Sequence, residues 1–444
     1  MSPLFHPSPP VFAAVLLAAS SAGADEPVRL SEQFPVGYQY HVSSRVELAG
    51  TITLPPEKDR PAPKPLAVSG ESAIEYDERV LALDGDGLPQ KTLRLYRRLD
   101  FQRKVGEQPQ ENTLRPAVRR LVLLRNKNTE VPFSPDGPLL WNEIDLVRTD
   151  VFTPALAGLL PGKLVRPGDR WTAAAAAVQE LTDLERIEEG ALECRLEQIT
   201  ALNGRRHARV ALSGTVRGTN EDGLNRQQLD GYFFFDLESN HLSYLYFKGI
   251  NSLLDKDGKE VGRLEGRFVL TRQANHKSSD LSDAALRGVA LEPTADNTLL
   301  LFDNPALGVR FLYPRRWRAS VLPNRQVALD GADGSGLLLT LEPPARVPTG
   351  AQFLNESRTE MQRHKAKELR LVPPERLQGP PQELEHFALE VEVGGQRVLM
   401  DYFVVRQANG GATLAARLLP ADLANLRKEV ERIARSVTIT GKGK

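Results

Sequence analysis

Residues Tyr232 to Phe247, with the sequence YFFFDLESNHLSYLYF, decide the fold class of this chain. Aromatic residues favour strands, and the Ser-Asn pair in the middle of the stretch suits a tight reversal. Because successive side chains of a strand point to opposite faces, Tyr232 and Phe234 share one face while Phe233 and Phe235 share the other. The stretch therefore predicts an antiparallel hairpin with aromatic side chains on both faces.

The aromatic residues of one face are the candidate ligand contacts of this hairpin, namely Tyr232, Phe234, Tyr244 and Tyr246. If both faces of the sheet carry rings, either the protein covers both faces or one face lines a cavity. Ordinary core packing and a cavity for an apolar ligand are the two interpretations of this pattern.

Alternation with period two extends outward from the hairpin over about residues 39–272. Turn sequences such as Asn203-Gly204 separate the alternating stretches, which is typical of a meander of antiparallel strands. We expect one large β-rich region over residues 25–272, with a possible subdivision near Asp150. The similar octets at 45–52 and 209–216 leave an internal duplication open as an alternative.

The periodicity changes after this region. Residues 273–297 are polar and follow neither the helical nor the strand period, so they are predicted to form a linker. Residues 298–440 combine short strands with a helix near 351–368 and a terminal helix. In that last helix Leu423, Leu426, Val430 and Ile433 fall on one face, which we expect to pack on a sheet. The sequence thus predicts a second, α+β domain.

The stretch Asn304–Trp317 contains a strand followed by Tyr313-Pro314-Arg315-Arg316-Trp317, and it resembles the opening of a PsbP-like (DcrB-like) domain. The resemblance covers about residues 299–440 and implies the fold of that family. It implies no site residues, since PsbP-like proteins share a fold without sharing a function, and they mostly bind other macromolecules. The β-rich region resembles only secreted bacterial proteins that share the turn Pro167-Gly168-Asp169-Arg170-Trp171.

The first 24 residues carry no charged side chain and enclose an apolar stretch that ends in Ala22-Gly23-Ala24. This pattern predicts a signal peptide cleaved after Ala24, and hence export to the periplasm or the outside of the cell. No second apolar run is long enough to span a membrane. Arg outnumbers Lys 42 to 15, which indicates a bacterial source rich in G and C. The only cysteine, Cys194, lies on the apolar face of an alternating stretch, where we expect it to be buried.

Composition and motifs exclude several classes of function. Basic and acidic residues both number 57, so no global positive field attracts nucleic acid. The histidines are scattered, and no stretch has the spacing of a zinc, calcium, phosphate-loop or nucleophile-elbow motif. We therefore predict no catalytic residues, no metal site and no cofactor from local sequence.

These observations predict a non-catalytic exported protein that binds a partner protein or a polymer in the cell envelope. Two alternatives remain: a carrier of an apolar ligand in the β-rich region, and a hydrolase that acts outside the cytoplasm, whose carboxylates would meet only in the folded chain. An enzyme is the less favoured of these classes.

Overall fold

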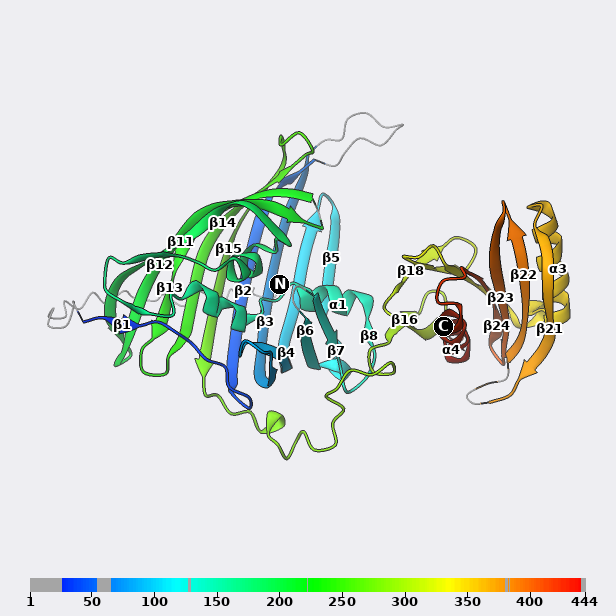
Figure 1. Cartoon of the computed structure of the whole chain (residues 1–444), viewed down its shortest axis with the longest axis horizontal. Coiled ribbons are helices and arrows are strands. Elements are labelled where there is room, and N and C mark those ends of the chain that lie inside the picture. The colour runs from blue at the N-terminus through cyan, green and yellow to red at the C-terminus, as the bar shows by residue number, and fades with distance from the viewer. Residues whose placement is uncertain are drawn as a thin grey trace, which may run out of the picture.

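The computed structural model describes residues 26–53, 65–126, 129–221, 223–379, 382 and 384–440. The predicted signal peptide, residues 1–24, lies outside the described residues. The rest is mostly antiparallel sheet with a few short helices, arranged as several separate sheets (Figure 1). The predicted fold class, a β-rich amino-terminal region followed by a mixed part, is confirmed.

The largest sheet has 12 strands, and all of its pairs are antiparallel. In spatial order they are β10 (Arg170–Thr172), β11 (Arg186–Leu202), β12 (Arg205–Asn220), β13 (Gly223–Asp236), β14 (His241–Leu254), β15 (Glu260–Ala274), β2 (Gln39–Ile52), β3 (Leu66–Leu83), β4 (Pro89–Val105), β6 (Arg120–Asn126) and β7 (Thr129–Phe133), while β5 (Gln108–Thr113) pairs with β4.

The first and the last long strands of this sheet meet in its middle, where β2 pairs with β15. Strands from before and after Asp150 therefore belong to one sheet. The chain runs from the edge strand β7 to the opposite edge strand β10 through residues 134–169. These residues include α1 (Trp141–Arg148) and the 3₁₀ helix η2 (Thr153–Leu159).

One face of the sheet, here called the inner face, holds the core. The crossing segment, together with α2 (Ala175–Thr182) and the small β1–β9 pair (Val28–Arg29 with Leu164–Val165), packs against it (Figure 1). Fully buried side chains from the sheet include Val42, Tyr76, Leu196, Val210, Phe233, Phe235, Leu245 and Leu270. Cys194 is among them, at 0% exposure, as its place on the apolar face predicts.

Residues 275–298 leave β15 and cross the other, outer face over β3 and β4. They contain the 3₁₀ helix η3 (Ser279–Leu281), and Leu281 and Leu286 are buried in a small second core with Leu93, Val122 and Phe133. The predicted linker is therefore packed on the sheet along much of its length.

The carboxy-terminal part contains two further sheets. The smaller has the order β25 (Thr438–Ile439), β17 (Val309–Tyr313), β16 (Leu300–Asn304) and β8 (Leu139–Leu140). The larger has the order β18 (Trp317–Leu322), β19 (Gln326–Gly331), β20 (Gly336–Glu342), β24 (Gly410–Leu418), β23 (Gln396–Gln407), β22 (Leu384–Val393) and β21 (Lys367–Leu377). The helical elements of the carboxy-terminal part are η4 (Pro344–Arg346), α3 (Gly350–Arg363) and α4 (Leu423–Ser436). A further 3₁₀ helix, η1 (Pro116–Val118), lies in the amino-terminal part.

The two helices predicted for this part from the sequence are both present, but one of them is shorter than expected. In α4 Leu426, Val430 and Ile433 are buried, as the spacing predicts, and Leu423, at the start of the helix, is half-buried. The helix predicted for 351–368 ends earlier, at Arg363, and β21 begins at Lys367. Lys365 takes a positive φ of 55°, a left-handed conformation that ends a helix and redirects the chain.

The two parts of the molecule contact each other through backbone and side chains. Strand β8 pairs in parallel with β16, with Leu139 opposite Leu300. The Arg315 guanidinium donates hydrogen bonds to the carbonyl oxygens of Thr298, at 2.8 Å, and of Pro132. A strand of the amino-terminal part therefore completes a sheet of the carboxy-terminal part.

Candidate functional site

The four predicted ligand contacts lie together on the outer face of β13 and β14. Tyr232 is directly opposite Tyr246, and Phe234 is opposite Tyr244. Ring centroids are 5.6 Å apart for Tyr232 and Tyr246, 6.0 Å for Phe234 and Tyr244, and 5.9 Å for the stacked pair Tyr232 and Tyr244. We call these four residues the outer-face aromatic cluster. The hairpin register brings them together because cross-strand neighbours on one face lie within contact distance.

The cluster differs in burial from the rings on the inner face. Phe233 and Phe235 are fully buried, whereas all four cluster residues are half-buried. The alternation predicted from the sequence is thus present, with the inner rings in the core and the outer rings facing solvent. The two pockets described below are lined by other residues.

Polar groups surround the cluster. The Arg209 guanidinium lies over the Tyr232 ring, 4.5 Å from its centroid, and is held there by an ion pair with Glu197. Burial, together with the neighbouring hydroxyl of Tyr232, raises the pKa of Tyr244 to about 12. The Tyr244 phenol is therefore neutral and can donate a hydrogen bond across the physiological pH range. The surface offers flat rings, hydroxyl groups and one cation, which suits stacking and hydrogen bonding.

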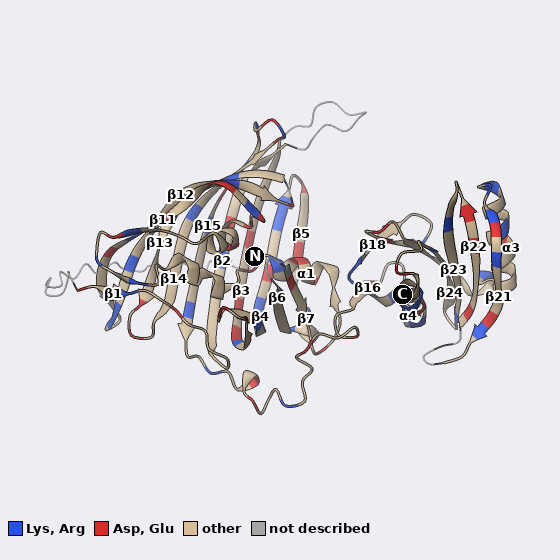
Figure 2. Ribbon diagram, viewed as in Figure 1, with Lys and Arg blue, Asp and Glu red and all other residues tan. Residues whose placement is uncertain are grey.

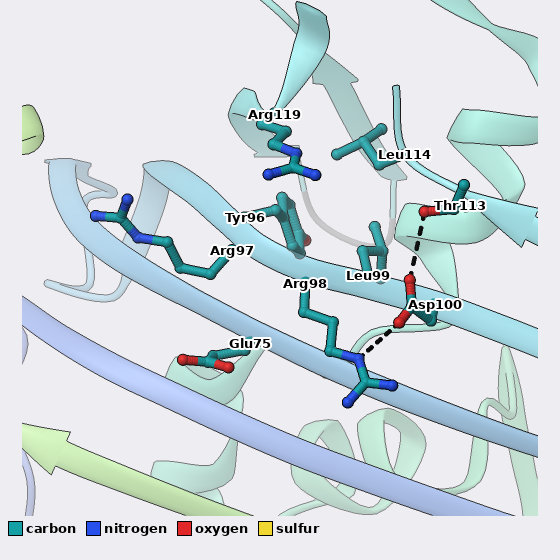
Figure 3. Close-up of a pocket in the computed structure, with 9 residues that line it drawn as sticks. All are labelled: Glu75, Tyr96, Arg97, Arg98, Leu99, Asp100, Thr113, Leu114 and Arg119. Carbon is teal, nitrogen blue, oxygen red and sulfur yellow. Dashed lines mark hydrogen bonds and ion pairs between the residues drawn. The ribbon is translucent and has the colours of Figure 1, made fainter. Parts of the chain in front are cut away.

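A pocket of about 390 Å³ opens where β4 stops pairing with β6 and begins to pair with β5 (Figure 3). Its lining includes the buried ring of Tyr96 and the guanidinium groups of Arg97, Arg98 and Arg119. Two carboxylates reduce this positive charge: Asp100 pairs with Arg98 at 2.6 Å, and Glu75 also lines the pocket. Arg97 in turn pairs with Asp77 and Asp280, so two of the three arginines of the pocket are matched by carboxylates.

A second pocket, of about 560 Å³, lies beside α4 and β17 and is lined by Pro138, Leu301, Arg310, Phe311, Leu312, Arg432, Arg435, Ser436 and Thr438. Two of its arginines are paired with carboxylates, Arg432 with Asp296 and Arg435 with Glu431. Elsewhere Lys and Arg residues and Asp and Glu residues are interspersed along the strands (Figure 2).

Carboxylates converge on the inner face of the sheet, around Arg94. The Arg94 guanidinium contacts Glu78 at 3.0 Å and Asp150 at 2.6 Å, and all three side chains are at most 1% exposed. Burial raises the pKa of Asp150 to about 7, although the nearby Arg94 lowers it. A hydrolase would need such carboxylates at the surface of a cleft, whereas here the protein encloses them.

Two histidines and an aspartate also converge, on the outer face beside the start of the 275–298 segment. The Asp77 carboxylate lies 2.9 Å from His41 Nδ1 and 3.4 Å from His276 Nε2. The pKa of the Asp77 carboxyl is lowered. Burial alone would raise this pKa, but the hydrogen bonds to the carboxylate, among them those from His41 and Arg97, have the larger combined effect. We call His41, Asp77 and His276 the histidine–aspartate cluster.

Sequence reasoning missed this cluster because its members are far apart in the chain. His41 and Asp77 meet only through the register of β2 on β3, and His276 follows β15, whose Gln273 is opposite His41. No local spacing carries this signal. Only the pairing of β15 with β2 brings the two histidines together.

No protein-family model matches this sequence, and no curated protein matches it. Among solved structures, the solution structure of cyanobacterial PsbP (CyanoP) from Synechocystis sp. PCC 6803 is 15% identical, covers 32% of this chain and 92% of that chain, and gives a TM-score of 0.26. The Ran-binding protein Mog1p of Saccharomyces cerevisiae is 11% identical over 32% of this chain and 96% of that chain, with a TM-score of 0.25.

A structure of lipovitellin is 11% identical, covers 56% of this chain and 26% of that chain, and gives a TM-score of 0.30. All three scores are below 0.5, so these similarities carry no argument about function. Within the described residues, no helix is both long and apolar enough to cross a bilayer.

Proposed function

We propose that this chain is a non-catalytic exported bacterial protein that binds a partner protein or a polymer of the cell envelope through its outer-face aromatic cluster. One observation carries the proposal. Four aromatic rings stay half-exposed on one face of a sheet whose other face already holds the core. Packing of the sheet therefore leaves these rings free to contact another molecule.

The chemistry of the cluster supports a binding role. Large rings release much ordered water when a ligand covers them, and they lose little conformational freedom because each has two side-chain torsions. Tyr232, Tyr244 and Tyr246 add hydroxyl groups that can hydrogen-bond with a polar polymer, and Arg209 already sits against the ring of Tyr232. Tyrosine and arginine are the residue types that dominate binding energy at interfaces.

The carboxy-terminal part adds a second line of support. We assign residues 298–440 to a PsbP-like domain, and in the structure the two large rings of its opening turn are buried, Tyr313 at 2% and Trp317 at 0% exposure. The resemblance implies a module that contacts other macromolecules. In this proposal the two parts of the chain present separate surfaces to the envelope.

Binding by the outer-face aromatic cluster can be tested in two ways. The mature full chain is mixed with purified peptidoglycan sacculi, and in living cells a photoreactive residue is placed at the exposed position 248, beside the cluster. We expect co-sedimentation with the sacculi or a specific crosslinked adduct. The double variant Tyr232→Ser/Tyr246→Ser should weaken that binding at least roughly tenfold, because each truncated ring removes on the order of 1 kcal/mol or more.

The matched control is Phe353→Ser, which removes a half-buried ring in α3 at the other end of the molecule. This variant should bind like the wild type, and circular dichroism should show that all variants fold. Binding that is equal in all variants, or absent from both assays, would contradict the proposal. An apolar ligand extracted from the purified protein, and lost from the double variant, would favour the carrier instead.

Export requires its own test, since the signal peptide is a prediction from sequence. Amino-terminal sequencing of the protein from the bacterial envelope should begin at Asp25. A chain that begins at Met1 in the cytoplasm would overturn the localisation, while leaving the binding measurements unaffected.

A further inference from the structure

The histidine–aspartate cluster has the donor set of a metal site, and we propose that His41, Asp77 and His276 bind a divalent transition-metal ion of the Zn²⁺ class. The ligand atoms of these three residues lie within 4.8 Å of one another. Neutral imidazole nitrogens with a carboxylate oxygen are the ligands that Zn²⁺ and its neighbours in the first transition row prefer.

The distances between ligand atoms fit one ion. With bonds of about 2.0–2.1 Å, two ligands of a tetrahedral ion lie roughly 3.3 Å apart. One carboxylate oxygen, Asp77 Oδ1, is 3.4 Å from His276 Nε2 and 2.9 Å from His41 Nδ1. Both distances are within a few tenths of an ångström of that spacing, and all three ligand atoms lie within 4.8 Å of one another, so an ion held by this oxygen would draw the two imidazoles together. The His41 and His276 side chains are 23% and 37% exposed, so water can supply a fourth ligand.

The surroundings also favour a metal-bound state. The second ring nitrogen of His41, Nε2, faces Glu75 at 3.6 Å. This contact is electrostatic, and it favours a proton on Nε2 once a metal ion takes Nδ1, so that a carboxylate lies behind the ligand as is common in histidine metal sites. Without the ion, Nδ1 hydrogen-bonds with Asp77. The other oxygen of the carboxylate, Asp77 Oδ2, accepts a hydrogen bond from Arg97 at 2.9 Å, so the two histidines share Oδ1 alone.

The net charge around the histidine–aspartate cluster is negative even when Arg97 is counted. Glu75, Asp77 and Asp280 supply three carboxylates around the cluster, and Arg97, which pairs with both Asp77 and Asp280, supplies the guanidinium. A divalent cation would offset the excess negative charge. Arg97 competes with such a cation for Asp77, so the site should bind the metal with an affinity that Arg97 limits.

A bound ion would have a structural effect. His41 belongs to β2, Asp77 to β3, and His276 to the segment that leaves β15 for the outer face. Coordination would therefore tie the beginning of the 275–298 segment to two strands of the sheet. Because binding to the folded chain alone stabilises it, metal should protect this segment from local opening.

The test is isothermal titration of Zn²⁺ into the metal-stripped mature chain at pH 7.5, where free imidazole is mostly neutral. We expect one site, and His41→Gln and His276→Gln should each weaken it by more than about tenfold. His364→Gln is the matched control, because His364 also faces a carboxylate, Glu360 at 3.1 Å, but outside the cluster. Its titration should equal that of the wild type.

A fourth variant distinguishes a metal site from a purely structural hydrogen-bonded cluster. Arg97→Gln removes the competing cation, so Zn²⁺ should bind several-fold more tightly, whereas a structural role alone would give no gain. In parallel, Zn²⁺ should slow tryptic cleavage at Lys277 in the wild type but not in His276→Gln. Absence of Zn²⁺ binding up to about 100 μM, or equal binding in all histidine variants, would overturn the proposal. Neither result bears on the aromatic cluster.

Discussion

Arg94 is a single guanidinium that faces two carboxylates in the middle of the inner face. Glu78 and Asp150 both contact it, and the hydroxyl group of Tyr40 donates to Glu78 at 2.6 Å. One positive charge cannot balance two buried negative charges, so one carboxyl tends to hold a proton. Burial is the main cause that raises the pKa of Asp150 to about 7, Arg94 opposes it, and the nearby Glu78 carboxylate adds to it.

The raised pKa of Asp150 predicts how the free energy of unfolding depends on pH. The ordinary pKa of an aspartate in an unfolded chain is about 3.9, so between pH 4 and 7 the folded state binds more protons than the unfolded state. The contribution of Asp150 to the free energy of unfolding is therefore fully present below pH 4 and is lost as the pH rises toward 7. Urea unfolding of the wild type and of Asp150→Asn at pH 5 and pH 8 should show this. The variant should gain stability relative to the wild type at the higher pH.

Other groups titrate over the same range, so the decisive quantity is the difference between the two proteins at each pH. Asp280→Asn, which removes an exposed carboxylate, is the control, and its difference from the wild type should change little. A wild type that gains stability relative to Asp150→Asn between pH 5 and 8 would contradict the assignment.

The burial of Cys194 predicts that its thiol does not react in the folded protein. Burial raises the pKa of its thiol to about 12, and the residue is fully buried between strands of the sheet. Reactive thiols are ionised and accessible, and Cys194 is neither. A thiol reagent such as iodoacetamide should label it only after denaturation, as mass spectrometry of the intact chain can measure. Rapid labelling of the native chain would show that the inner core opens.

At the scale of elements, the turn from β17 to β18 shows how a short motif positions a domain. Pro314 follows the last residue of β17, and Trp317 begins β18 with its ring fully buried. The indole nitrogen of Trp317 donates to Glu429 in α4 at 2.8 Å. The turn therefore joins both sheets of the carboxy-terminal part to the terminal helix.

Replacing that ring should destabilise the carboxy-terminal part. Trp317→Ala removes a large buried side chain and leaves the Glu429 carboxylate without its indole partner, so we expect a loss of about 3–5 kcal/mol in the free energy of unfolding. Trp141→Ala removes a half-buried ring in α1 and should cost clearly less. Urea unfolding followed by circular dichroism compares the two. Equal losses would mean that the turn does not anchor the helix.

At the scale of the whole molecule, we propose the division expected from the sequence: 25–272, a linker over 273–297, and 298–440. Limited proteolysis should cut inside the linker and leave two folded pieces. The exposed basic residues Lys277 and Arg287 are the expected tryptic sites. The pairing of β8 with β16 should keep the pieces together under native conditions.

The packing of the linker sharpens this expectation. Leu281 is fully buried in the second core, so Leu281→Asp should release the segment and speed its cleavage several-fold. Ala285→Asp, at an exposed position of the same segment, should change the rate little. Gel electrophoresis over time measures both. A chain that resists trypsin between 273 and 297 in both variants would count against separate domains.

The sequence by itself determined the antiparallel strands, the alternation that separates Phe233 and Phe235 from the outer-face aromatic cluster, the buried face of α4 and the burial of Cys194. These features depend on near neighbours in the chain, because strand and helix periods are local geometry. The early end of α3 depended on one residue, Lys365, in a conformation that the apolar pattern does not encode.

Only the tertiary structure decided that β2 pairs with β15, that the segment after Asp150 crosses the inner face, and that the histidine–aspartate cluster forms. The pairing of β2 with β15 joins segments that lie more than 200 residues apart in the chain, and the cluster forms only in that register. A shift of one residue in that register would turn His41 to the other face of the sheet. Core packing across the whole sheet selects the register, and no short stretch of sequence contains that information.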